Sequence, residues 1–185
     1  MKTLITLIFA VLVLSTYAVA ATAAVDKNEY FIQVESTGSR IPMKLIKSTI
    51  PFNKSYKSLS DTDKLTFRSY YEDIPAANTP PFPANGMRQI AADVKDAHSK
   101  MRKAGPLFAV ASIDKLGKVS KVAVYASPDE RMSQLVSASL WDTEFEPGIC
   151  AGEPCAMEFV LDWELLRMRA AARIDSEKKT RNSRR

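Results

Sequence analysis

The clearest periodic pattern in the chain lies near its C-terminal end, in residues 156–165. Large apolar side chains occupy every second position of this stretch: Met157, Phe159, Leu161, Trp163 and Leu165. Three of the intervening positions are acidic: Glu158, Asp162 and Glu164. A period of two residues predicts a β-strand with one buried face and one solvated, largely acidic face.

Two strands and a helix are predicted before this last strand. Residues 107–114 predict a strand that contains several small residues, and residues 115–118 form a hairpin turn with Gly117 at a position that favours positive φ. The returning strand carries Val122, Val124 and Ala126 on one face. Residues 127–130 predict a helix start, with Ser127 as the cap, proline at the first helical position and glutamate three residues after the cap.

The consecutive order strand, strand, helix, strand predicts an α+β fold, a small antiparallel sheet with helices packed on one face. A further amphipathic helix is expected over residues 87–103, and it ends at Gly105 and Pro106. The only histidine, His98, borders the apolar face of this helix. With no cysteine or serine partner indicated nearby, a hydrogen-bonded position at the edge of the core explains His98 better than a functional role.

Residues 25–83 are expected to form an N-terminal arm that precedes a module over residues 84–166. Residues 29–34 and 41–46 predict a hairpin, although Pro42 removes one donor from its ladder.

The rest of this arm predicts a helix and a connector. Ser60 and Asp63 resemble a helix N-cap, and the spacing of apolar residues predicts a helix over residues 61–73. Tyr70 and Tyr71 are interpreted as a packing surface for the next segment. Four prolines within residues 75–83 predict an extended connector at the boundary between arm and module.

The first 24 residues have the three-part pattern of a secretory signal peptide. Lys2 precedes an apolar centre over residues 4–14, and small residues follow it. A mature protein in the periplasm or secreted from the cell is therefore expected. The alternative is an uncleaved inner-membrane anchor over residues 3–25, because an uncharged run of about 20 residues spans a bilayer.

Cys150 and Cys155 lie five residues apart in a turn-rich loop. They fit an oxidising compartment and predict a short structural disulfide. Redox or metal chemistry is the alternative, but the spacing is not C-x-x-C and no histidine or further cysteine stands nearby.

The formal net charge of +5 is concentrated at one end of the 185-residue chain. From Trp163 to the C-terminus there are eight basic and three acidic residues, so the rest of the chain is neutral. The excess belongs to a tail over residues 167–185, and no nucleic-acid partner is expected. The tail is expected either to be simply solvated or to contact an anionic membrane surface through Lys178, Lys179, Arg181, Arg184 and Arg185.

Several short motifs lie between residues 80 and 166. They are D-x-x-G-K-V in the hairpin turn (residues 114–119), F-x-P (residues 145–147) and G-x-P (residues 152–154), with Pro-Pro-Phe-Pro upstream. With the strand order above, this set resembles the C-terminal domain of the TonB family of energy transducers. Because only one short Pro-rich piece precedes the module, the expected protein is a periplasmic relative without the family's long Pro-rich spacer.

The resemblance implies that the last strand can pair with an extended peptide of an envelope partner. The residues that would flank this edge strand are Glu158, Val160, Asp162 and Glu164. The alternative is that the N-terminal hairpin or the C-terminal segment covers the edge, since natural proteins cover long exposed strands.

The expected function is therefore that of a non-enzymatic, TonB-like binding or adaptor protein of the periplasm. The alternative is an envelope-surface protein held by its basic tail. The chain has one histidine and no Gly-rich phosphate loop, G-x-S-x-G sequence or paired-carboxylate motif, so no catalytic residue, metal or cofactor is predicted.

Overall fold

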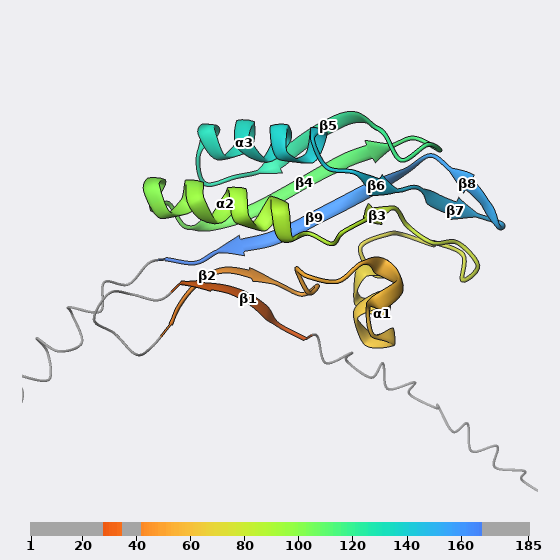
Figure 1. Cartoon of the computed structure of the whole chain (residues 1–185), viewed down its shortest axis with the longest axis horizontal. Coiled ribbons are helices and arrows are strands. Elements are labelled where there is room, and N and C mark those ends of the chain that lie inside the picture. Colours follow the sequence, from red (N-terminus) through yellow and green to blue (C-terminus); the bar gives the residue numbers. More distant parts are fainter. Residues whose placement is uncertain (1–27, 35–41, 168–185) are drawn as a thin grey trace, which may run out of the picture.

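Figure 1 shows the computed structural model, which describes residues 28–34 and 42–167. The described part is mixed α+β, with three α-helices and a five-stranded antiparallel sheet of order β1-β2-β9-β4-β5. The sheet strands are β1 (Tyr30–Val34), β2 (Met43–Ser48), β4 (Gly105–Ile113), β5 (Val119–Ala126) and β9 (Met157–Leu165). The helices are α1 (Asp61–Arg68), α2 (Arg88–Met101) and α3 (Glu130–Trp141), with a 3-10 turn η1 at Tyr56–Ser58. The predicted α+β class is confirmed.

Four short strands form two further antiparallel pairs beside the main sheet. β3 (Phe82–Pro83) pairs with β6 (Phe145–Glu146), and β7 (Gly148–Cys150) pairs with β8 (Glu153–Cys155). Both pairs lie at the end of the molecule where β9 begins (Figure 1).

The helices α2 and α3 lie side by side over one face of the sheet (Figure 1). The alternating apolar side chains of β9 and β4 point into this layer and are at most 3% exposed: Leu107, Ala109, Ala111, Ile113, Phe159, Leu161, Trp163 and Leu165. Complete burial of one such large side chain contributes about 1.5–3 kcal/mol to folding. The period of two in the sequence therefore places β9 correctly against the core.

The arm and the predicted module share this core. Phe67 of α1 is 1% exposed. Five aromatic rings from both parts of the chain surround it, with ring centroids 5.1–6.2 Å away: Tyr56, Tyr70, Tyr71, Phe82 and Phe159. Residues on both sides of the expected boundary at residue 83 therefore pack into one core.

The Pro-rich segment is part of the fold, and the prediction of a connector is corrected. Thr79 exchanges two backbone hydrogen bonds of 2.8 Å with Ile149, and Phe82 pairs with Glu146. Pro80 and Pro81 lie between these paired positions, where the ladder does not use their missing N–H groups. Prolines at such irregular, edge-like positions permit pairing, so the segment lies along β6 and β7.

Several element ends differ from the predictions by a few residues. The helix α1 ends at Arg68 rather than at residue 73, and two consecutive turns follow it. The helix α3 begins at Glu130, because Asp129 rather than Ser127 caps it and accepts a 2.9 Å hydrogen bond from the Arg131 N–H. The strand β2 extends to Ser48, two residues beyond the predicted end.

His98 lies deeper than the predicted edge of the core. Its side chain is fully buried, and Nε2 donates a 2.9 Å hydrogen bond to the Leu166 carbonyl. The histidine thereby joins α2 to the end of β9, which is a structural role.

The buried carboxylate of Asp63 joins β1 to the start of α1. It accepts hydrogen bonds from the Ser60 hydroxyl (2.6 Å), the Tyr30 hydroxyl (2.7 Å) and the Asn28 amide (3.1 Å). Burial by itself raises the pKa of Asp63, but these hydrogen bonds together outweigh burial and hold the pKa below its usual value. Ser60 also accepts from the Asp63 N–H, so the predicted N-cap is confirmed.

Replacing Phe67 by alanine should lower the free energy of unfolding by about 3–5 kcal/mol, because it removes the ring at the centre of the aromatic cluster. Leu65→Ala in the same helix is the matched control: Leu65 is 59% exposed, and its loss should cost less than about 0.5 kcal/mol. Urea unfolding is followed by circular dichroism and by tryptophan fluorescence. The two probes should report one transition, and two separate transitions would show that arm and module unfold independently.

Asp63→Asn should destabilise the protein near neutral pH more than in acid. A lowered pKa in the folded state means that the carboxylate stabilises the fold above the unfolded pKa, and that this stabilisation is lost as pH falls through the folded pKa. Unfolding free energies at about pH 6 and about pH 3 should therefore differ between wild type and variant mainly at the higher pH. Asp61→Asn, at an exposed position of the same turn, is the control. An equal deficit of Asp63→Asn at both pH values would contradict the role of the charge.

Candidate functional site

The last strand β9 is the middle strand of the sheet, so the prediction of an edge strand is wrong. The strand β4 pairs with β9 at all nine of its positions, from Met157 to Leu165. On the outer side of β9, the side away from β4, β2 pairs only with Trp163, Glu164 and Leu165. The predicted alternative, that the N-terminal hairpin covers this edge, therefore holds for the last three residues of the strand.

The sequence of β2 explains why this pairing stops. Ser48 is the last residue of β2, and its hydroxyl accepts a 3.0 Å hydrogen bond from the Ile50 N–H, which turns the chain. Pro51 follows and has no N–H to offer a ladder. The outer side of residues 157–162 therefore has no strand beside it in the described part of the chain.

A tyrosine closes part of this outer side instead. The Tyr71 hydroxyl donates a 2.8 Å hydrogen bond to the Glu158 carbonyl. The same hydroxyl interacts with the backbone of Val160. Burial raises the pKa of Tyr71 and outweighs the opposing effect of the Val160 backbone, so the side chain stays a neutral donor. One phenol thus occupies backbone positions that a neighbouring strand would otherwise pair with.

Tyr71 belongs to a segment that we call the tyrosine strap, residues 69–78. Arg68 holds the strap by donating to the carbonyls of Ile74 (3.2 Å), Pro75 (2.7 Å) and Asn78. The Tyr70 hydroxyl hydrogen-bonds to Thr49. The strap is thus attached to the end of α1 and to the turn after β2.

The far end of the strap reaches the β7–β8 hairpin, where the Asn78 side chain accepts a 3.1 Å hydrogen bond from the Ala151 N–H. Within the strap, Asp73 has a φ of +48°, which is uncommon for a residue with a side chain. The strap is therefore held by hydrogen bonds at both ends, contains one residue in a strained backbone conformation, and lies beside β9.

The four residues predicted to flank the edge have different surroundings. Glu158, Asp162 and Glu164 are exposed, and Val160 is 9% exposed. The side chains of these residues alternate with those of the core, so they lie on the sheet face opposite to α2 and α3. Glu164 pairs with Lys47 of β2, whose ammonium lies 3.9 Å from its carboxylate. The candidate site is consequently confined to residues 157–162.

The neighbouring strands add aromatic groups to this face. Across the ladder, Phe108 is opposite Asp162, and its ring lies 5.8 Å from that of Tyr125 on β5. Tyr125 is 70% exposed. The face beside the candidate site therefore combines carboxylates with aromatic surface.

The predicted disulfide is present between Cys150 and Cys155. It joins β7 to β8 across the turn that contains Ala151 and Gly152, both of which have positive φ. In the loop-entropy description, closing so short a loop contributes on the order of 2 kcal/mol. The bridge therefore acts locally, on the hairpin that also receives the strap.

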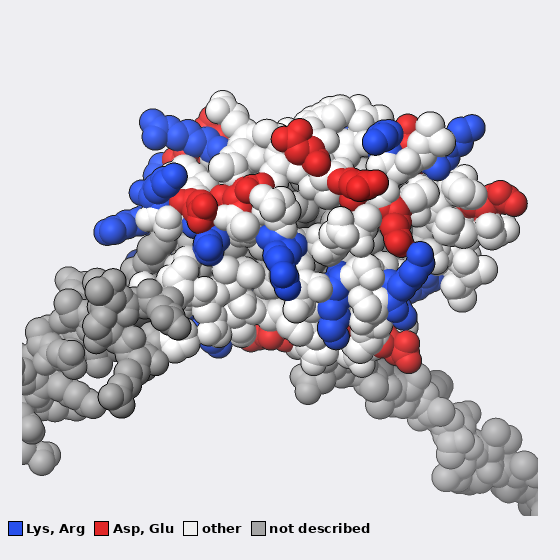
Figure 2. Space-filling view, viewed as in Figure 1, with Lys and Arg blue, Asp and Glu red and all other residues white. Residues whose placement is uncertain are grey.

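Other predicted features fall outside the described residues. The expected signal peptide, the alternative membrane anchor over residues 3–25 and the basic positions Lys178, Lys179, Arg181, Arg184 and Arg185 lie there. Within residues 28–34 and 42–167, no helix is long and apolar enough to cross a membrane, and no group of three potential metal ligands occurs. On the face shown in Figure 2, acidic and basic side chains of the described part are interspersed.

Comparison with known proteins adds no relative to this description. A scan of the sequence against protein-family models finds no match, and a search of curated proteins finds none either. The resemblance to the TonB C-terminal domain therefore rests on the residues alone.

Sequence reasoning missed the role of Tyr71. Its spacing from Phe67 fits a helical face, and both residues do pack together with ring centroids 5.7 Å apart. The helix ends before Tyr71, however, and the turns that follow direct its hydroxyl to β9. The only signal in the sequence was an aromatic residue with a hydrogen-bonding end, which needs a partner when buried.

Tyr71→Phe should loosen the outer side of β9 without removing the packing of the ring. The Glu158 carbonyl loses its donor in an exposed hydrogen bond, which costs about 0.5–1.5 kcal/mol. Local opening should then rise roughly two- to tenfold, and hydrogen–deuterium exchange of residues 157–162 measures this change. Tyr125→Phe, which removes an exposed hydroxyl, is the control. Unchanged exchange in Tyr71→Phe would show that the hydroxyl does not close the strand.

Proposed function

We propose that the protein is a non-enzymatic binding or adaptor protein that works outside the cytoplasm and takes up an extended peptide as an added strand on the outer side of β9, at residues 157–162. One observation carries the proposal: β9 pairs with β2 at three of its nine positions, and a single tyrosine side chain closes part of the remainder. A peptide strand that replaces the Tyr71 hydroxyl would form backbone hydrogen bonds in place of the contacts that this hydroxyl makes with Glu158 and Val160.

The order of elements supports the proposal, because the proposal rests on the resemblance to the TonB C-terminal domain and this order is part of that resemblance. The strands β4 and β5, the helix α3 and the strand β9 follow one another, with three short strands between α3 and β9. The D-x-x-G-K-V motif forms the turn between β4 and β5, where Gly117 has a φ of +79°. We propose that a TonB-like module with these parts binds a partner by strand addition. Membership of the TonB family is part of this proposal.

The strand β5 is a less suitable acceptor, although it lies at the end of the sheet. Its register with β4 shifts twice, once between Phe108 and Ala109 and once between Ser112 and Ile113. Lysines stand at positions 118 and 121 at its start. Bulges and edge lysines discourage the addition of a further strand, whereas the register of β9 with β4 has no such shift.

The side chains of β9 suggest the chemistry of the peptide. Glu158 and Asp162 are exposed on one face of the strand, four residues apart. In an antiparallel or parallel added strand, residues on the same face lie opposite these carboxylates. We infer that the peptide carries a lysine or arginine opposite Glu158, where a salt-sensitive contact sets its register.

The disulfide supports a location outside the cytoplasm. Disulfides persist in oxidising compartments such as the periplasm and are rare in the cytosol. The bond between Cys150 and Cys155 closes a short hairpin loop and has the character of a structural bridge.

Photo-crosslinking in cells tests the proposed function. A photoreactive amino acid replaces Glu158 in the full chain, and a matched protein carries the same group at Lys121 on β5. We expect an adduct with an envelope protein from position 158 and not from position 121, and a higher yield when Tyr71→Phe is added. The absence of an adduct from position 158, or the same adduct from both positions, would contradict strand addition at β9.

A further inference from the structure

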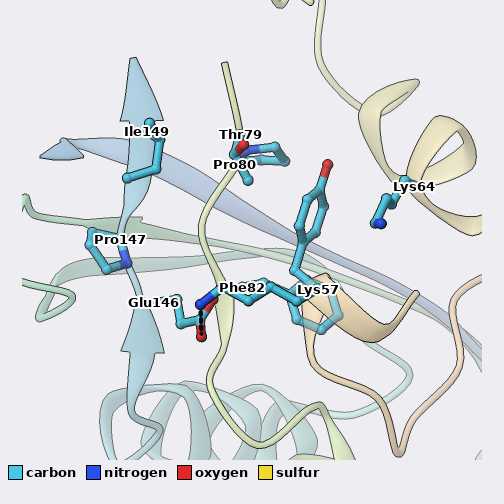
Figure 3. Close-up of a pocket in the computed structure, with 9 residues that line it drawn as sticks. Lys57, Lys64, Thr79, Pro80, Phe82, Glu146, Pro147 and Ile149 are labelled. Atoms are coloured by element: carbon cyan, nitrogen blue, oxygen red, sulfur yellow. Dashed lines mark hydrogen bonds and ion pairs between the residues drawn. The ribbon is translucent and has the colours of Figure 1, made fainter. Parts of the chain in front are cut away.

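A pocket of about 540 Å³ lies beside α1, away from the proposed strand site. Its volume is within the range of small-molecule sites, about 300–1,000 Å³. Figure 3 shows that three segments distant in sequence surround it. They are residues 56–64 with the start of α1, residues 79–82 of the Pro-rich segment, and residues 146–149 of β6 and β7.

The pocket has a wall of rings and branched apolar side chains that are already fixed in place. This wall consists of Tyr56, Pro80, Phe82, Pro147 and Ile149. Phe82 is 1% exposed, and its ring lies 5.1 Å from Phe67. The two 2.8 Å backbone hydrogen bonds between Thr79 and Ile149 join two of the segments that form this wall. A pocket of proline and aromatic rings has few rotamers to lose, so an apolar ligand would bind at a low cost in conformational entropy.

The charges around the pocket do not cancel. Lys57 and Lys64 line it together with one carboxylate, Glu146. The Lys57 ammonium lies 3.2 Å from Glu146, and the dashed line in Figure 3 marks this ion pair. Lys64 as a residue is half-buried, and its ammonium has no hydrogen-bond or ion-pair partner among the described residues. Within the described part of the chain, one positive charge thus has no counter-charge beside the apolar wall, and Tyr56 and Thr79 line the same pocket.

We propose that this pocket binds a monoanionic ligand with a flat or branched apolar body and one carboxylate. The apolar body packs between Tyr56, Pro80 and Ile149, and the carboxylate pairs with Lys64. Charge complementarity sets the class: one surplus cation beside an apolar wall favours one negative charge. Such a carboxylate belongs either to a small free acid or to the C-terminal end of a peptide. The pocket uses none of the residues at the outer side of β9, so it is independent of the proposed strand addition.

Binding of 3-phenylpropionate to the full mature chain tests this site. Its uncharged analogue 3-phenylpropanamide has the same shape, so the pair isolates the carboxylate. We expect the acid to bind about tenfold or more tightly than the amide, with amide chemical-shift changes in nuclear magnetic resonance spectra at Thr79 and Ile149. Equal binding of acid and amide, or no shift at these residues up to millimolar acid, would overturn the proposal.

Two charge variants should act in opposite directions, which a general loss of structure would not produce. Lys64→Gln should weaken binding of the acid about fivefold, and Glu146→Gln should strengthen it, because the second variant leaves Lys57 uncompensated. Lys121→Gln, on β5, is the matched control and should leave the affinity unchanged. Equal affinities in Lys64→Gln and Lys121→Gln would overturn the assignment of the carboxylate to Lys64.

A peptide pair distinguishes the two sources of the carboxylate. Ala-Ala-Phe with a free C-terminus is compared with its C-terminal amide, and both with 3-phenylpropionate. Tighter binding of the free peptide than of 3-phenylpropionate would identify a chain end as the ligand, and weaker binding would identify a small acid. Either result supports the pocket if Ile149→Trp, which fills it, abolishes binding while the circular dichroism spectrum is retained. Retained affinity in that folded variant would overturn the site.

Discussion

The backbone of β9 needs hydrogen-bond partners on both of its sides, because the strand runs through the middle of the sheet and its apolar face is buried. One side is satisfied completely by β4. The other side receives three residues of β2, and then the Tyr71 hydroxyl. The N-terminal arm is arranged around this requirement: its hairpin supplies the strand, and the segment after its helix supplies the tyrosine.

The aromatic cluster around Phe67 holds these parts in position. Tyr71 packs against one side of this ring, and Tyr56 and Phe82 of the pocket pack against others. Phe159 of β9 also contacts it. The strap beside β9 and the wall of the pocket therefore pack against the same ring, that of Phe67. This shared ring limits the movement of side chains in both places.

Proline has a different role in this chain from the one its composition suggests. Several prolines in succession usually indicate an extended linker with solvated backbone. Here the segment that contains Pro80 and Pro81 has a paired residue on each side, Thr79 and Phe82, and the prolines themselves line the pocket or fill the core. The pairing is irregular and skips the residues that lack an N–H group. Prolines, which interrupt regular strands, therefore fit into this segment and make it a rigid wall.

Much of the fold follows from the sequence by itself. The alternation from Met157 to Leu165 determined β9 and its buried face, Gly117 determined the turn between β4 and β5, and the spacing of two cysteines determined a short disulfide. These features depend on neighbours in the chain, on periodicity and on the conformational range of single residues. The signal was weaker for α1, where helical spacing continues past Arg68 although the helix does not.

Only the tertiary structure decided which segments lie beside β9. A hydrophobic pattern tells which face of a strand is buried, but backbone N–H and C=O groups are the same in every strand and do not specify a neighbour. The place of β2 in the sheet, the contact of Tyr71 with Glu158 and the pairing of Thr79 with Ile149 therefore arise from long-range packing. The same holds for the pocket, because its lysines and its apolar wall come from segments that the chain brings together only when it folds.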